Sequence, residues 1–171
     1  GGAVAGTRHA AFVGVTGATN AVVFRFEMRD TTGLQASLIA VEVLDIQGFD
    51  AADWQNLRLV KDTDADGVFD AGTDPVLATG FFAGGRATFD GMRWTVPGGA
   101  TRQLFLTADV SATSAADGDR LGAIVASVQD LGFEEPTAVA GTWPLDAGGR
   151  LPVDGFTVEQ LTSFPVPAAT A

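Results

Sequence analysis

Apolar and polar side chains alternate with a period of two residues over much of the chain, which is typical of β-strands with one buried face. From Phe24 to Arg29 the apolar and charged residues alternate without interruption, so the segment Val22–Arg29 predicts a half-buried strand. A similar pattern occurs in Leu104–Val110 and, in a shorter form, in Met92–Val96. These three segments are the clearest strand predictions in the sequence.

A longer apolar run, Leu38–Ile46, predicts a strand with Ile39, Val41 and Val43 on one face and Glu42 on the other. One helical turn is expected at residues 50–54, where the Asp50 side chain can cap the first N–H groups. Further short strands are predicted at Leu57–Leu59, Leu121–Val128, Thr137–Ala140 and Gly155–Val158.

Many short strands joined by glycine-rich turns indicate an all-β protein. We expect an antiparallel β-sandwich, either Ig-like or jelly-roll-like, formed by residues 1–162 as a single domain. Residues 163–171 are rich in Pro, Ala and Thr and are expected to form an extended tail.

Composition and charge narrow the range of partners. The 171 residues carry a net charge of -11 and include 10 Lys and Arg against 21 Asp and Glu. A nucleic acid or an anionic membrane requires a basic face, so neither is an expected partner. No cysteine is present, which excludes disulfides and thiolate metal sites, and no apolar run is long enough to span a membrane.

The most informative segment is Asp62–Asp74, in which five carboxylates occur within 13 residues. These charges would repel one another unless a cation lay between them. Side chains at the first, third and fifth positions converge when such a loop curls around Gly67, and the carbonyl at the seventh position follows. Hard oxygen ligands favour Ca²⁺, with Mg²⁺ as the second choice. The expected ligands are Asp62, Asp64, Asp66, the Val68 carbonyl, Asp70 and Asp74.

This loop resembles the calcium loops of EF-hands, dockerins and thrombospondin type 3 repeats. It departs from the EF-hand pattern at the twelfth position, where Thr73 replaces a bidentate Glu, and Asp74 is the candidate for that role. The wider segment, approximately residues 19–128, resembles the calcium-loop β-sandwich modules of bacterial secreted and cell-surface proteins. The resemblance implies an extracellular sandwich in which the loop joins two strands.

Other candidate sites are weaker. Asp117 and Asp119 are either a second cation site or part of a solvated hairpin turn. Glu134 and Glu135 are adjacent and would face opposite ways on a strand, which does not suit a glycosidase pair. His9 is the only histidine, and no nucleophile-elbow motif accompanies it, so we do not expect an enzyme.

Three tryptophans raise the possibility of a sugar-binding surface. Trp94 alternates into the expected core, and Trp54 is expected to pack under the turn that begins at Asp50. Trp143 is then the candidate for an exposed aromatic platform.

These features predict a secreted, calcium-stabilised structural protein that is a subunit or module of an extracellular filament or surface layer. The apolar segment His9–Val15 is either the first strand of this domain or a strand donated to a neighbouring copy, within a donor segment of residues 1–16. Expected partners are further copies of the chain or neighbouring surface-protein modules. The alternative function is an adhesive or carbohydrate-binding module of a larger cell-surface protein.

Overall fold

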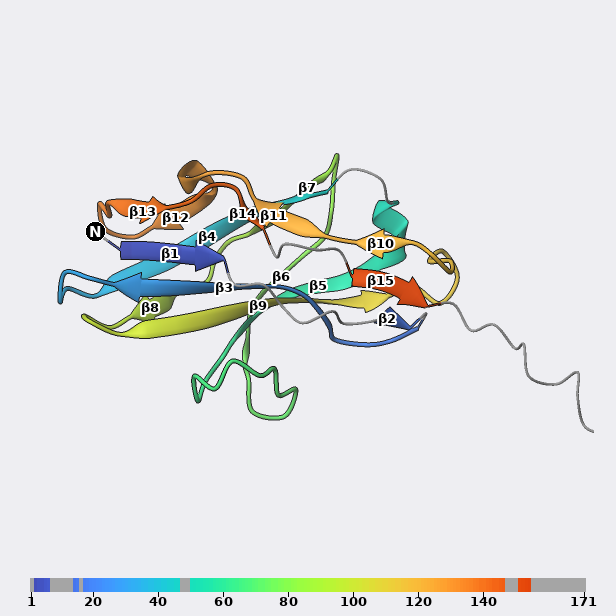
Figure 1. Ribbon diagram of the computed structural model, residues 1–171, viewed down its shortest axis with the longest axis horizontal. Helices are drawn as coiled ribbons and strands as arrows, with labels where there is room; N and C mark the ends of the chain where they lie inside the picture. Colours follow the sequence, from blue (N-terminus) through green and yellow to red (C-terminus); the bar gives the residue numbers. More distant parts are fainter. Residues whose placement is uncertain (1, 7–13, 16, 47–49, 147–150, 155–171) are drawn as a thin grey trace, which may run out of the picture.

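The computed structural model describes residues 2–6, 14–15, 17–46, 50–146 and 151–154 (Figure 1). Within these ranges the chain forms fifteen strands and two short 3-10 helices. Their bounds are β1 Gly2–Gly6, β2 Gly14–Val15, β3 Ala21–Asp30, β4 Ala36–Asp45, η1 Ala51–Asp53, β5 Trp54–Lys61, β6 Val76–Gly80, β7 Arg86–Phe89, β8 Trp94–Val96, β9 Thr101–Val110, β10 Arg120–Leu121, β11 Ala123–Val125, η2 Val128–Asp130, β12 Leu131–Phe133, β13 Val139–Gly141, β14 Leu145–Asp146 and β15 Leu151–Asp154.

The first sheet has six strands in the order β13-β1-β3-β9-β5-β6. The long strands β3 and β9 pair antiparallel at its centre, from Ala21 opposite Ala108 to Arg29 opposite Thr101. All neighbours in this sheet are antiparallel except β1 and β13, which run parallel.

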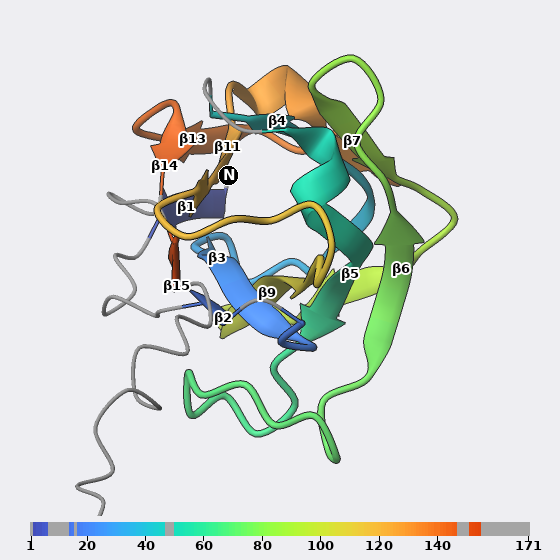
Figure 2. The ribbon, with the colours of Figure 1, turned by 90° about the vertical axis from the view of Figure 1, so that its right-hand side faces the viewer.

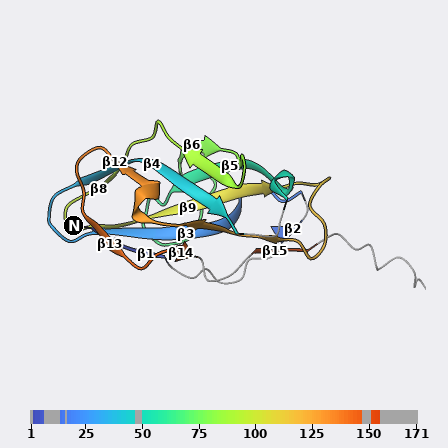
Figure 3. The same cartoon turned by 90° about the horizontal axis from the view of Figure 1, so that it is seen from above.

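The second sheet is built around the ten-residue strand β4. Strands β8 and β7 pair with one edge of β4, while β12 and β11 pair with its other edge, and β14 adds to β11. A small sheet of β10, β15 and β2 lies at one end of the molecule (Figures 1 and 3).

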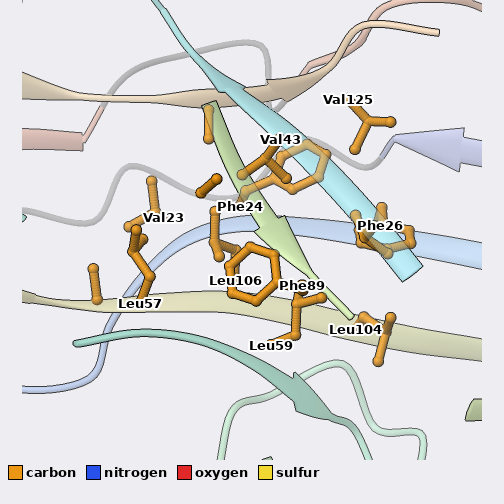
Figure 4. Packing of buried hydrophobic residues seen from close by; sticks show 14 of the residues in the cluster. Val23, Phe24, Phe26, Val43, Leu57, Leu59, Phe89, Leu104, Leu106 and Val125 are labelled. Atoms are coloured by element: carbon orange, nitrogen blue, oxygen red, sulfur yellow. The ribbon is translucent and has the colours of Figure 1, made fainter. Parts of the chain in front are cut away.

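Apolar residues of the two larger sheets face each other and form the core, so the protein is a β-sandwich (Figure 2). Phe24 and Phe26 of β3 and Leu104 and Leu106 of β9 are fully buried in it, together with Phe89 from the opposite sheet (Figure 4). The all-β class and the antiparallel sandwich predicted from alternation are therefore confirmed.

The predicted face of β4 is wrong at one residue. Val41 and Val43 are buried as expected, but Ile39 is exposed and Leu38 is buried in its place. The reason is an irregularity in the pairing with β12, where Gly132 lies opposite Ala40 and the next residue, Phe133, lies opposite Leu38. Such a bulge shifts the alternation by one residue, which the sequence pattern alone does not reveal.

The N-terminal segment pairs within its own chain wherever it is described. Strand β1 lies between β3 and β13, and β2 pairs parallel with Val153–Asp154 of β15. Strand β1 was not expected from the sequence. The predicted segment His9–Val15 falls outside the described residues except for its last two, and Gly155–Val158 and the tail 163–171 lie outside them entirely.

A polar cluster on β9 holds the end of the first sheet together. The Arg58 guanidinium donates to both carboxylate oxygens of Asp109, at 2.9 and 3.1 Å, and the Asn56 amide donates to Asp109 Oδ2 at 2.7 Å. The backbone N–H of Asn20 donates to Asp109 Oδ1 at 2.9 Å. These hydrogen bonds, that of Arg58 above all, lower the pKa of Asp109 to about 2.

This lowered pKa predicts an acid-sensitive stability. Because the ordinary pKa is 3.8, Asp109 stabilises the folded state fully above that value and loses this contribution as pH falls through about 2. Asp109→Asn should lower the free energy of unfolding at neutral pH by about 2 kcal/mol. The difference in free energy of unfolding between Asp109→Asn and the parent protein should become smaller in acid, as measured by urea unfolding at a series of pH values. The exposed control Asp90→Asn should do neither, and a pH-independent difference would contradict the assignment.

Candidate metal site

The acidic segment forms the loop between β5 and β6, on the outer side of the first sheet (Figures 1 and 2). Its neck is closed by two backbone hydrogen bonds. The N–H of Lys61 donates to the Pro75 carbonyl at 3.0 Å, and the N–H of Asp62 donates to the Gln103 carbonyl of β9 at 3.2 Å. The loop therefore starts and ends at fixed points on the sheet.

Asp62 organises the first half of the loop. Its carboxylate is fully buried and accepts hydrogen bonds from the N–H of Ala65 at 2.7 Å and the N–H of Gly67 at 2.9 Å. Both donors have positive φ angles, 62° at Ala65 and 79° at Gly67, so the backbone curls tightly around the carboxylate. This is the turn that the sequence pattern placed at Gly67.

Asp74 organises the second half in the same manner. It is buried, with Oδ1 accepting from the N–H of Thr63 at 3.0 Å and Oδ2 accepting from the N–H of Asp70 at 2.9 Å. Because Thr63 and Asp74 belong to opposite ends of the loop, this carboxylate joins the two ends.

The five carboxylates gather in two overlapping groups that share Asp64. Ligand oxygens of Asp62, Asp64 and Asp74 lie within 4.8 Å of one another, and so do those of Asp64, Asp66 and Asp70. Either group could hold a metal ion with oxygen ligands. The side chain of Val68 is exposed and its N–H donates to Asp66 Oδ1 at 2.7 Å, while the position of its carbonyl is fixed by no hydrogen bond described for the loop.

The electrostatics of the loop favour a cation. Burial raises the pKa of Asp62, and the neighbouring carboxylates Asp64 and Asp74 raise it further, against the lowering effect of the two N–H donors. A carboxylate that is costly to ionise in its folded setting is stabilised as the anion by a nearby positive charge. A bound divalent cation would supply that charge.

Two polar side chains of the sheet support the loop from beneath. Arg25 of β3 donates from Nη1 to the Gly67 carbonyl at 2.9 Å, and Gln103 of β9 lies beside the same glycine. Phe69 packs edge-on against Phe105, with ring centroids 6.0 Å apart, in a small apolar cluster separate from the main core. The loop is thus fastened to β3 and β9.

These three supporting residues were not identified from the sequence. Arg25 and Gln103 occupy polar positions of strands and read there as solvent-facing residues. Phe69 was the one available signal, because a large aromatic residue within an acidic loop requires an apolar surface to cover it.

The weaker acidic candidates do not form a metal group in the described part of the chain. Asp119 Oδ2 accepts from the N–H of Ala116 at 2.6 Å, as in a hairpin turn, and neither Asp117 nor Asp119 belongs to a cluster of three ligands. Glu134 pairs with Arg93 at 2.7 Å, whereas Glu135 accepts from the N–H of Ser37 at 3.3 Å. The two glutamates therefore engage separate partners.

The aromatic candidates are more buried than a sugar platform requires. Trp94 and Trp54 are core residues, as expected, and Trp54 also makes an edge contact with Phe82. Trp143 is partly buried and packs against the core, so none of the three tryptophans is fully exposed. His9 lies outside the described residues.

Comparison with known proteins gives no family for this chain. No family model matches it, and no curated protein matches it significantly. No helix in the described residues is long and apolar enough to cross a membrane. The function is therefore argued from the loop and the strands around it.

The tight turn at Gly67 leads to a prediction about the loop. A Cβ at this position would lie 2.6 Å from Arg25 Nη1, and its φ of 79° strains any L side chain. Gly67→Ala should therefore lower the free energy of unfolding by about 2 kcal/mol. Gly72→Ala in the same loop is the matched control, because a Cβ there meets nothing within 4 Å. Equal stability of the two variants in thermal unfolding would contradict this account.

Proposed function

We propose that the β5–β6 loop binds Ca²⁺ and that the ion stabilises the sandwich. The observation that carries this proposal is the convergence of Asp62, Asp64 and Asp74 within 4.8 Å, with two of the three carboxylates buried. Asp74 then takes the role left open by Thr73 at the twelfth position of the loop.

The donor set supports calcium over other metals. All candidate ligands are carboxylate or carbonyl oxygens, which suit hard cations, and neither histidine nor cysteine occurs in the loop. Calcium accepts six to eight oxygens in flexible geometry, whereas Mg²⁺ requires a tighter octahedron. Mg²⁺ usually keeps several waters in its octahedron and therefore needs few protein oxygens. A loop with five carboxylates offers more oxygen ligands than that.

We propose further that the protein is a secreted structural component of an extracellular filament or surface layer. Extracellular calcium is millimolar, which suits the weak sites of extracellular modules. The hydrogen bonds of the loop join strands of one sheet, which supports a role of the ion in stability. This use of calcium matches that of the secreted β-sandwich modules which the sequence resembles.

Calcium should raise the melting temperature. An ion that binds only the folded state adds about 2.7 kcal/mol at a hundredfold excess over Kd. Asp64→Asn should abolish most of this gain with little effect on the metal-free protein, because Asp64 is exposed and shared by both carboxylate groups. Differential scanning calorimetry with calcium, magnesium and a chelator measures these effects.

The control for this experiment is Asp90→Asn, an exposed aspartate outside the loop. Its calcium response should equal that of the parent protein. Coincident melting curves of the parent protein in calcium and in chelator would refute the calcium site, and a larger response to magnesium would reassign the ion.

For assembly, we propose exchange of the N-terminal strand between copies. Strand β1 lies inside a sheet, between β3 and β13, and seven residues, 7–13, separate it from β2 in the sequence. In the pairing with β3, Gly2 of β1 lies opposite Asp30, Val4 opposite Met28 and Gly6 opposite Phe26. Glycine therefore occupies two of the three β1 positions that face these buried residues. A strand with so few large residues is bound mainly through its backbone, which a second copy can supply equally well.

Strand exchange predicts self-association that depends on the N-terminus. Removing residues 1–16 should expose the edges of β3 and β13, lower the melting temperature and abolish ordered assembly. A synthetic peptide of residues 1–16 should restore the stability of the truncated protein without restoring assembly. Size-exclusion chromatography with light scattering in calcium measures both, and a strictly monomeric full-length chain at all concentrations would refute strand exchange.

A further inference from the structure

A pocket of about 260 Å³ opens at one end of the sandwich. It lies where β3 ends, β4 begins and the segment between β12 and β13 passes, which is the end of the molecule opposite to β15 and β10 (Figures 1 and 3). Its apolar lining comes from Met28, Leu34, Val96, Phe133, Pro136 and Val139. The volume is below that of typical small-molecule sites and suits one or two side chains of a peptide.

The chemistry of the pocket disfavours a basic occupant, because its lining includes the exposed Arg29 and both of its carboxylates are already engaged. Both lining carboxylates are engaged within the protein: Asp30 accepts from Thr32 and from the N–H of Gly99, and Glu135 accepts from the N–H of Ser37. These groups hold backbone N–H donors and do not offer a free anion to a basic ligand. At the rim, Leu34 is 72% exposed and adds apolar surface around the opening.

The chain itself contains a segment with matching chemistry. Among residues 155–171 the only charged residue is Glu159, although the whole chain is 18% charged. Residues 160–167, Gln-Leu-Thr-Ser-Phe-Pro-Val-Pro, contain three large apolar residues and no charge. Proline fixes φ, so Pro165 and Pro167 reduce the backbone entropy that this sequence loses on binding in a groove.

The position from which this segment departs favours a second copy as its acceptor. Strand β15 ends at Asp154, beyond the first residues of β3, while the pocket lies at the far end of that ten-residue strand (Figure 1). Strand β3 spans about 33 Å. Phe164 follows Asp154 by ten residues and reaches about 33 Å when fully extended, so a route along its own copy has no slack. A copy placed end to end offers its pocket much closer.

We propose that residues 160–167 of one copy bind in the pocket between β3, β8 and β12 of a second copy. The proposal rests on the self-association proposed above and gives it a direction, because a contact between opposite ends of two copies propagates as an open chain. The two contacts are adjacent, because Met28, Asp30 and Val139 of the pocket also pair with β1.

Engineered disulfides test this contact, since the chain contains no cysteine of its own. Copies carrying Gln35→Cys at the pocket rim are mixed with copies carrying Ser163→Cys and oxidised in millimolar calcium. Docking raises the local concentration of the pair, so the mixed disulfide should form about tenfold more than with Thr79→Cys, an exposed control position on β6. Adding Leu34→Asp to the first partner should remove the excess.

The control for Leu34→Asp is Phe81→Asp, which alters a side chain that is 76% exposed and outside the pocket, and which should leave the disulfide yield unchanged. Equal yields at positions 35 and 79 would overturn the proposal. In a chain that carries both Gln35→Cys and Ser163→Cys, a disulfide that forms at a rate independent of dilution would also overturn it, because that disulfide lies within one copy. Light scattering of the parent protein distinguishes failure of this proposal from failure of the proposed self-association. If the parent protein forms oligomers but the excess disulfide is absent, only binding in the pocket is refuted. If the parent protein is monomeric and the excess disulfide is absent, self-association is refuted as well.

Discussion

The buried carboxylate of Asp62 determines the conformation of the β5–β6 loop and therefore the site. Removing this group from water costs several kcal/mol unless donors or a cation surround it. The chain provides two N–H donors by turning through positive φ at Ala65 and Gly67, and this turn brings Asp64 beside Asp62 and Asp74. The turn that gives the buried Asp62 carboxylate its hydrogen bonds thus also gathers three carboxylates, whose negative charge a divalent cation can neutralise.

The same loop is part of the packing of the first sheet. Arg25 reaches its backbone from β3, and Phe69 covers Phe105 of β9, so ordering the loop also orders the central strand pair. The chain carries a net charge of -11, and a bound divalent cation reduces this by two. Mutual repulsion between copies of so acidic a protein opposes assembly, and neutralisation within the loop lessens that repulsion.

The sequence predicted those elements whose side chains alternate and missed those defined by backbone alone. Strands β3 and β9 follow from their alternating residues, and the turn at Gly67 follows from the spacing of the aspartates. Ile39 was placed on the wrong face because a bulge changes register without changing composition. Strand β1, Gly-Ala-Val-Ala-Gly, has no alternation of size or polarity, and its position depends on hydrogen bonds to strands distant in sequence. Likewise, the role of Arg25 depends on a loop more than forty residues away.

Strand β3 connects the features that bear on function. Its centre carries Arg25, which supports the loop. Its second half, from Phe26 to Asp30, pairs with β1, and its last residues, Met28 to Asp30, line the end pocket. None of the hydrogen bonds described for the loop reaches β1 or a residue that lines the pocket. Besides its effect on net charge, the proposed ion would influence those contacts through the β3–β9 pair, to which the loop is fastened. Because a rigid acceptor loses less entropy on binding a strand or a peptide, an ion bound as proposed at the loop would strengthen the proposed contacts at β1 and at the pocket.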